Sequence, residues 1–193
     1  MRLRHAVLVV LASVAGVPAA RADDVSDQID KAAAAWRAHD ANAAITALDA
    51  AASLLRQARA DSLKALLPLP PPGWSADPAE TSAVSAAMLG GGITASRSYH
   101  NGAQSMQVQI TSDSPMLQGM AALIGSPLAS ASGVRTVMIG GRQMSYTEND
   151  NGYMALIANK IVVKVDGSKD TPEPTLRSFV ASIDFDSLEK FAH

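Results

Sequence analysis

The stretch from Val134 to Asp166 constrains the fold more than any other part of the chain, because it contains four short segments separated by turn residues. In the last segment, one face holds Ile161, Val163 and Val165, and the other holds Lys160, Lys164 and Asp166, which is the period-2 pattern of a half-buried strand. Gly140-Gly141 and Asn151-Gly152 supply the positive φ values that tight antiparallel connections need. We therefore predict a four-stranded meander.

Two further strands and two helices complete the predicted sheet domain. Ile93–Tyr99 and Met106–Ile110 alternate on either side of the hairpin signal Asn101-Gly102. Residues 113–125 begin with Asp-Ser-Pro, which is typical of a helix start. A last helix begins at Asp170 or Thr171. Four apolar residues of this helix are predicted to face the sheet: Leu176, Phe179, Val180 and Ile183.

Strands that occur in runs indicate an α+β fold with a mainly antiparallel sheet, in the order β-β-α-β-β-β-β-α. Residues 23–67, which precede it, are rich in alanine and contain no Gly or Pro. Their turn-forming residues 38–42 predict a helical hairpin, with Asp40 or Asn42 as N-cap of the second helix. One uninterrupted helix is the alternative, but it would exceed the usual globular length. Two apolar faces are predicted: Ile29, Ala33 and Trp36 on the first helix, and Ile45, Leu48, Ala52 and Leu55 on the second.

The proline-rich segment after the hairpin predicts a linker over residues 68–76, because adjacent prolines hold the backbone in an extended, semi-rigid form. Trp74 is predicted to close one end of the core. The sheet domain would then occupy residues 77–193, and deletion of residues 23–67 would leave it folded.

The first 22 residues have the features of a cleavable signal peptide. Arg2 and Arg4 precede an apolar run over residues 6–17, and Ala20-Arg21-Ala22 has the form of a signal-peptidase site. We predict export to the periplasm and a mature chain that begins at Asp23. A retained N-terminal anchor is the alternative.

Charge and cysteine content exclude several classes of function. Without residues 1–22, the chain has 13 Lys and Arg against 18 Asp and Glu, a net charge of −5. This argues against nucleic acid and anionic membranes as partners, because both require a basic surface. The chain contains no cysteine, which excludes thiol nucleophiles, zinc–thiolate sites and CxxC redox chemistry.

From Trp74 onward, the pattern resembles the PsbP/Mog1-type fold, a curved antiparallel sheet with helices on its faces. The segments Gly90–Gly92, Asp113–Met120 and Gly140–Gln143 are similar to those of a group of uncharacterised exported proteins of proteobacteria. The first resemblance implies a fold alone. The second brings no known activity.

No recognisable catalytic motif is present, so we predict that the protein is not an enzyme and has no catalytic residues. The histidines outside the signal peptide, His39, His100 and His193, lack the spacing of a metal motif. There is no G-x-S-x-G nucleophile elbow. The segment 148–152 (Glu-Asn-Asp-Asn-Gly) has too few carboxylates for a calcium loop, and it is explained as a hairpin turn. No cofactor is predicted.

The sequence leaves three functional hypotheses. The first is a non-enzymatic periplasmic accessory or binding protein whose helical hairpin binds another envelope protein. The second is a carrier of a small molecule or of copper, with a site between the sheet and the predicted helix 115–125. Met116, Met120 and His100 are its candidate metal ligands, since thioethers bind Cu(I), although core packing also explains the methionines. The third is a hydrolase without a recognisable motif, for which His100 is the candidate base.

Overall fold

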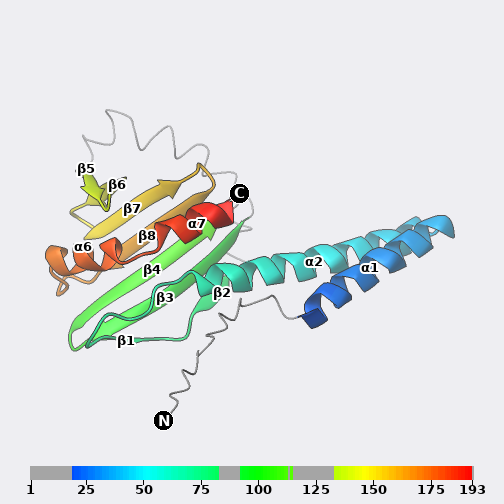
Figure 1. Cartoon of the computed structure of the whole chain (residues 1–193), viewed down its shortest axis with the longest axis horizontal. Helices are drawn as coiled ribbons and strands as arrows, with labels where there is room; N and C mark the ends of the chain where they lie inside the picture. The colour runs from blue at the N-terminus through cyan, green and yellow to red at the C-terminus, as the bar shows by residue number, and fades with distance from the viewer. Residues whose placement is uncertain (1–18, 83–91, 113, 115–132, 193) are drawn as a thin grey trace, which may run out of the picture. The chain divides into compact units, whose positions relative to one another are not determined.

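The computed structural model describes residues 19–82, 92–112, 114 and 133–192 (Figure 1). The chain divides into two compact units, residues 1–58 and residues 59–193. Two helices are followed by an antiparallel sheet and two further helices, which confirms the α+β class. The helices are α1 (Ala19–Arg37), α2 (Ala41–Ala65), α6 (Glu173–Ala181) and α7 (Phe185–Ala192). The strands are β1 (Ser75–Ala76), β2 (Glu80–Ser82), β3 (Ile93–Asn101), β4 (Gln104–Ser112), β5 (Val134–Ile139), β6 (Arg142–Thr147), β7 (Gly152–Ile157) and β8 (Ile161–Gly167).

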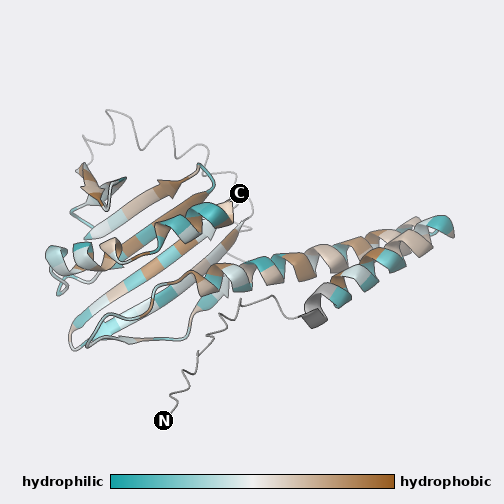
Figure 2. Cartoon of the chain, in the orientation of Figure 1, coloured by the Kyte–Doolittle hydropathy of each residue, from teal (hydrophilic) through white to brown (hydrophobic). Residues whose placement is uncertain are grey.

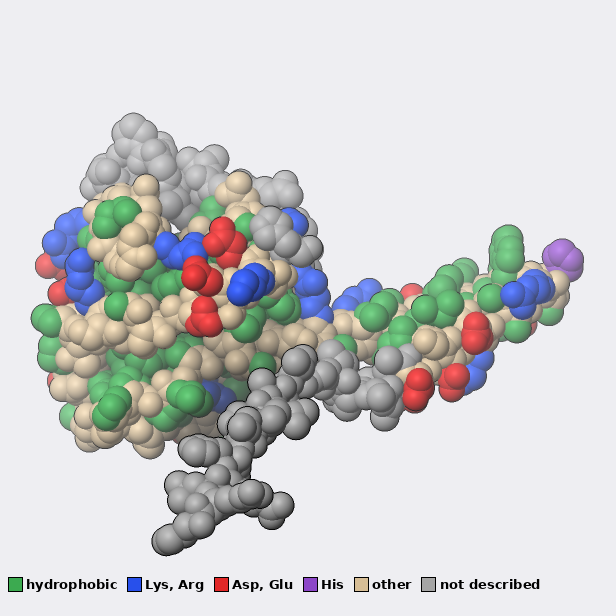
Figure 3. All heavy atoms as spheres, viewed as in Figure 1, with side chains coloured by type: hydrophobic (Ala, Val, Ile, Leu, Met, Phe, Trp, Pro, Cys, Tyr) green, Lys and Arg blue, Asp and Glu red, His purple; other side chains and the backbone are tan. Residues whose placement is uncertain are grey.

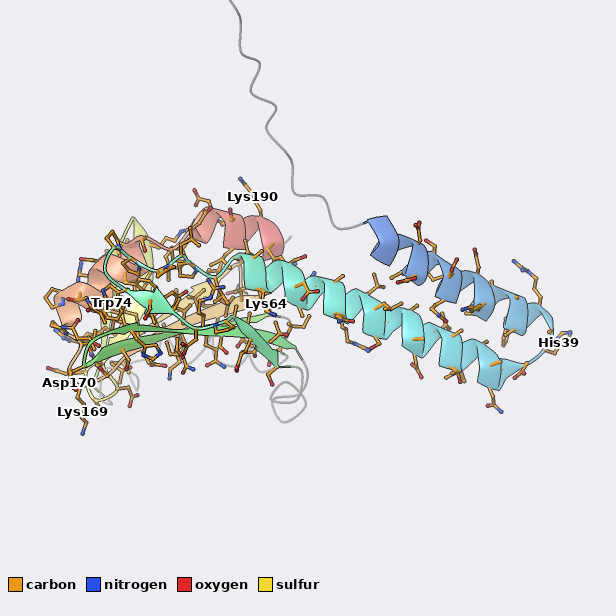
Figure 4. All side chains as sticks on the ribbon, turned by 90° about the horizontal axis from the view of Figure 1, so that it is seen from below. His39, Lys64, Trp74, Lys169, Asp170 and Lys190 are labelled. Carbon is orange, nitrogen blue, oxygen red and sulfur yellow. The ribbon has the colours of Figure 1, made fainter. Side chains whose placement is uncertain are left out.

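The first unit confirms the predicted helical hairpin, formed by α1 and the first part of α2 (Figure 4). His39 ends α1 in the left-handed conformation, with φ of 60°. The amides of His39 and Asp40 donate to the carbonyls of Trp36 and Ala35, the pattern of a Schellman motif. Asp40 Oδ1 accepts a hydrogen bond of 2.9 Å from the amide of Ala43, so Asp40 is the N-cap of α2. The break between α1 and α2 therefore depends on a local feature of the sequence, the N-cap residue Asp40.

Replacing Asp40 with Ala is expected to destabilise the hairpin by about 1 kcal/mol, because the amide of Ala43 loses its partner. His39→Gly is expected to act in the opposite direction, since glycine adopts positive φ without the steric cost that a side chain adds. Thermal unfolding followed by far-UV circular dichroism measures both. Equal unfolding curves for Asp40→Ala and the parent would show that the cap contributes nothing.

The second unit is built on an eight-stranded antiparallel sheet, with the order β1-β3-β4-β8-β7-β6-β5 and β2 also paired with β3. The predicted meander is confirmed as β5–β6–β7–β8, and β8 then pairs with β4. Two short strands, β1 and β2, extend the other edge beyond β3. The predicted helix at 115–125 lies outside the described residues.

The hairpin turns show which of the predicted positive φ values were right. Gly140 and Gly141 both have positive φ, as predicted, and join β5 to β6. At the next turn Asn151 has φ of 44°, but Gly152 does not share it and is the first residue of β7. The prediction for Gly152 was therefore wrong. A Cβ there would lie 2.6 Å from Asp166 Oδ1, so a larger residue at this position would require the Asp166 side chain to move.

The core lies between the sheet and the helices α6 and α7. Helix α6 packs against β8 and β5, and α7 packs against β7. Figure 2 shows hydrophobic and hydrophilic residues alternating along β4, as the pattern predicted. In β8, Ile161, Val162 and Val163 are all buried, and the alternation begins at Lys164. The four apolar residues predicted for the last helix are buried: Leu176, Phe179, Val180 and Ile183. The rings of Tyr99 and Phe179 meet edge-to-face, with centroids 4.9 Å apart.

The start of α6 differs from the prediction. Its N-cap is Pro172, without a side-chain hydrogen bond, and neither Asp170 nor Thr171 caps it. Thr171 is buried, and its hydroxyl donates to the carbonyl of Ser105 at 2.8 Å. This hydroxyl links the segment before α6 to β4. Thr171 therefore uses its hydroxyl in a tertiary hydrogen bond and does not cap the helix.

The predicted linker belongs to the second unit. Leu63 and Leu67 are buried in its core, and Trp74 and Ala76 pack against that core. Tyr99 donates a hydrogen bond of 2.7 Å to the carbonyl of Pro68. The last two turns of α2 and the prolines after it are therefore structural parts of the sheet unit. In the described part of the chain, no helix is both long and apolar enough to cross a membrane.

Candidate functional site

His100, the predicted metal ligand or base, is hydrogen-bonded to Asp77 at the edge of the sheet. Its Nε2 lies 3.0 Å from Oδ2 of Asp77, and the side chains are 46% and 58% exposed. The hydroxyl of Ser75 donates to the backbone carbonyl of His100, at 3.3 Å, rather than to its ring. Strand pairing between β1 and β3 brings these residues together, a contact that no sequence spacing indicated. An exposed pair of this kind gives neither a screened base nor an oriented nucleophile.

Of the three predicted copper ligands, His100 alone lies within the described residues. Met116 and Met120 lie outside them. Within the described residues, no three His, Cys, Asp or Glu side chains are grouped so as to hold a metal ion. Met106 and Met144 are buried in the core, as the packing explanation predicted, whereas Met138 is exposed.

Hydrogen bonds of Asn151 hold the turn 148–151 in place. Its side-chain oxygen accepts a hydrogen bond from Tyr146, and Nδ2 donates to the carbonyls of Ser168 and Thr171, at 3.1 and 2.9 Å. The backbone carbonyl of Asn151 accepts a further bond, from Gly167. These contacts explain the conformation of the turn without a bound calcium ion.

A groove of about 790 Å³ lies in the described part of the second unit. One wall is the segment between the end of α2 and β1, and the other is formed by α6, the turn after it and the first turn of α7. Its apolar lining residues are Ala65, Leu66, Leu67, Pro68, Leu69, Pro71, Pro72, Trp74, Met106 and Phe179. Its polar lining residues are Thr175, Ser178, Ser182, Asp184 and Ser187. Its volume lies within the range of small-molecule sites, ~300–1,000 Å³.

The proline-rich wall of this groove is fixed in place. Tyr99 bonds the carbonyl of Pro68, and the amide of Trp74 donates to the carbonyl of Pro71. Prolines add stiffness, because their φ is locked. Trp74 is half-buried between this wall and the core (Figure 4). Sequence reasoning identified the stiffness of the segment but not the groove, since the opposite wall comes from a helix about 100 residues later.

The hairpin presents a second candidate surface. The alanines Ala32, Ala44, Ala47 and Ala51 are buried within it. Small side chains here allow α1 and α2, which run side by side in Figures 1 and 4, to approach closely. By contrast, the large residues of both predicted apolar faces are exposed, whereas Ala33 and Ala52 of those faces are half-buried. Five of the seven exposed large apolar residues in the described part of the chain lie on the hairpin: Ile29, Trp36, Ile45, Leu48 and Leu55.

These five side chains lie on one side of the hairpin. On α2, Ile45 and Leu48 each follow a buried alanine by one residue, a rotation of about 100°. On α1, Trp36 likewise follows the half-buried Ala35. Viewed from one end of the hairpin, one helix turns clockwise along the chain and the other turns counterclockwise. A rotation of about 100° away from the buried alanines therefore places the large apolar residues of both helices on the same side of the hairpin. Figure 3 shows hydrophobic side chains along one edge of the hairpin and acidic groups along the other. We call the five residues the hairpin apolar face.

No protein-family model, curated protein or solved structure was found to match this chain, so the proposals below rest on its own sequence and geometry.

Proposed function

We propose that this protein is a non-enzymatic accessory protein of the periplasm that binds another envelope protein through the hairpin apolar face. The observation that carries the proposal is the burial pattern of the hairpin. Its alanines are buried between the two helices, and its large apolar side chains are exposed to solvent. A contiguous exposed apolar surface of this kind is typical of a protein-interaction site.

The spacing of the face favours a helical partner. Ile45, Leu48 and Leu55 recur at intervals of three and seven residues, the spacing at which a helix inserts side chains between those of another helix. Burial of a Leu or Ile side chain contributes roughly 1.5–3 kcal/mol. Several such residues provide enough free energy for a specific complex, even after the cost of association.

The periplasmic location rests on the predicted signal peptide. The predicted mature N-terminus, Asp23, falls within α1 as it is folded in the full chain. Mass spectrometry of protein recovered from the periplasm is expected to give a chain that begins at Asp23. Recovery of a membrane-associated chain that retains residues 1–22 would favour the N-terminal anchor.

The double substitution Leu48→Gln and Leu55→Gln tests the hairpin apolar face. It is expected to abolish recovery of the partner in crosslinking from periplasm without lowering the helicity of the hairpin. Glutamine is nearly as good a helix former as leucine, and both side chains are exposed. Ser53→Gln, on the same helix but outside the face, is the matched control and is expected to retain the partner.

Two results would contradict the proposal. Unfolding of the hairpin by the double substitution would mean that Leu48 and Leu55 stabilise the hairpin itself. Unchanged crosslinking would mean that the partner binds elsewhere. Sedimentation velocity of the purified chain separates the remaining cases, because self-association that the double substitution removes would identify the partner as a second copy.

A further inference from the structure

The groove beside α6 combines an apolar floor with an unusual polar wall. Leu67, Trp74 and Phe179 contribute apolar surface. The polar wall includes serine hydroxyl groups that already donate their protons in hydrogen bonds within the protein. Ser178 donates to the carbonyl of Pro174 at 2.9 Å, and Ser182 donates to that of Phe179 at 2.6 Å. Hydroxyl oxygens that donate elsewhere offer only lone pairs to a ligand.

Asp184 adds the only charge to the lining of the groove. Ser187 donates two hydrogen bonds to it, from its amide to Oδ1 at 3.0 Å and from its hydroxyl to Oδ2 at 2.7 Å. These bonds lower the pKa of the Asp184 carboxyl below its ordinary value, so it is ionised at neutral pH. None of the lining residues is Lys, Arg or His. Ser178, Ser182 and Asp184 therefore give this wall hydrogen-bond acceptors and a negative charge.

We propose that this groove binds an amphiphile that has an apolar chain and an ammonium group. The apolar chain lies against Leu67, Trp74 and Phe179, and the ammonium group donates to Asp184 and the hydroxyl oxygens of α6. The ammonium group matches the wall in charge and in its supply of donors. A fatty acid or another anionic amphiphile would bring a second negative charge beside the ionised Asp184, and none of the lining residues is Lys, Arg or His to offset the repulsion.

This assignment differs from the carrier site predicted from the sequence, which lay between the sheet and the helix 115–125. It also goes beyond the proposed function, because the groove belongs to residues 59–193 and the hairpin apolar face to residues 1–58. Either proposal can fail while the other holds.

Tryptophan fluorescence tests the proposal in the full chain. Trp36 and Trp74 are its two tryptophans, so the Trp36→Phe variant reports on Trp74 alone. This variant is titrated with decylammonium, decyl maltoside and decyl sulfate, each below its critical micelle concentration. The cationic probe is expected to give a saturable change and to bind about tenfold more tightly than the anionic one, a difference of about 1.4 kcal/mol. It is also expected to raise the melting temperature, as a ligand of the native state does.

Asp184→Asn, made in the Trp36→Phe background, provides the decisive comparison. Asn is as good an N-cap as Asp, so the amide of Ser187 keeps its partner and α7 its start. The substitution is expected to remove the preference for the cationic probe while leaving decyl maltoside binding unchanged. Asp170→Asn, an exposed carboxylate outside the groove, is the control for a general charge effect and is expected to preserve the preference.

Three results would overturn the assignment. They are the absence of a saturable Trp74 signal with any probe, equal affinities for the cationic and anionic probes, and a preference for the cationic probe that survives Asp184→Asn. Added salt is expected to weaken the cationic preference, because the carboxylate is exposed to solvent.

Discussion

A chain shortened to begin at Pro68 is expected to be unfolded, whereas a chain that begins at Arg59 is expected to unfold cooperatively. The difference is the end of α2, whose Leu63 and Leu67 are 0% and 5% exposed in the core of the sheet unit. Loss of a buried leucine side chain costs about 2–5 kcal/mol. Loss of both is comparable to the whole free energy of unfolding of a domain, roughly 5–15 kcal/mol.

Urea unfolding of the two fragments, followed by circular dichroism and Trp74 fluorescence, measures this difference. The chain that begins at Arg59 also keeps the contact between the Arg59 guanidinium and the Phe191 ring, whose centroid lies 4.7 Å away. A folded fragment that begins at Pro68 would contradict the structural role of α2. It would support instead the boundary that the sequence predicted, between residues 67 and 68.

Single substitutions in the full chain provide the matched control. Leu63→Ala is expected to cost about 2–5 kcal/mol, and Leu55→Ala within ±0.5 kcal/mol. The two residues lie on the same helix and undergo the same change. Only Leu63 is buried, whereas Leu55 belongs to the hairpin apolar face. Equal losses would mean that both leucines stabilise α2 in the same way.

Asn151→Ala is expected to destabilise the sheet unit by about 2–4 kcal/mol. The substitution removes the hydrogen bonds to Tyr146, Ser168 and Thr171, each of which contributes about 1 kcal/mol. It also places alanine at a φ of 44°, where a side chain other than Asn or Asp is disfavoured. Urea unfolding of the full chain gives the free energy directly.

Two further variants separate the causes. Asn151→Asp keeps a residue that tolerates positive φ but turns a carboxylate oxygen toward the carbonyls of Ser168 and Thr171, so it is expected to be destabilising as well. Asn149→Ala, in the same turn but exposed, is expected to change stability by less than about 0.5 kcal/mol. A stabilising effect of calcium that is lost in Asp150→Ala would contradict this explanation of the turn and restore the calcium hypothesis.

Local chemistry made part of this fold predictable from the sequence. The inward residues of β4, Met106, Val108 and Ile110, followed from alternation, because successive side chains of a strand point to opposite faces. The cap at Asp40 followed from its short side chain, which reaches an amide three residues ahead. Both features depend on neighbours within a few residues, which the sequence displays directly.

The candidate sites depend on contacts between distant residues, and only the tertiary structure decided them. The groove exists because α6 lies opposite the proline-rich segment, and His100 meets Asp77 because β1 pairs with β3. Periodicity found the apolar rows of the hairpin but could not tell which row faces inward. Alanines occupy the contact because they let helices approach closely, and this leaves the larger Ile, Leu and Trp side chains facing solvent.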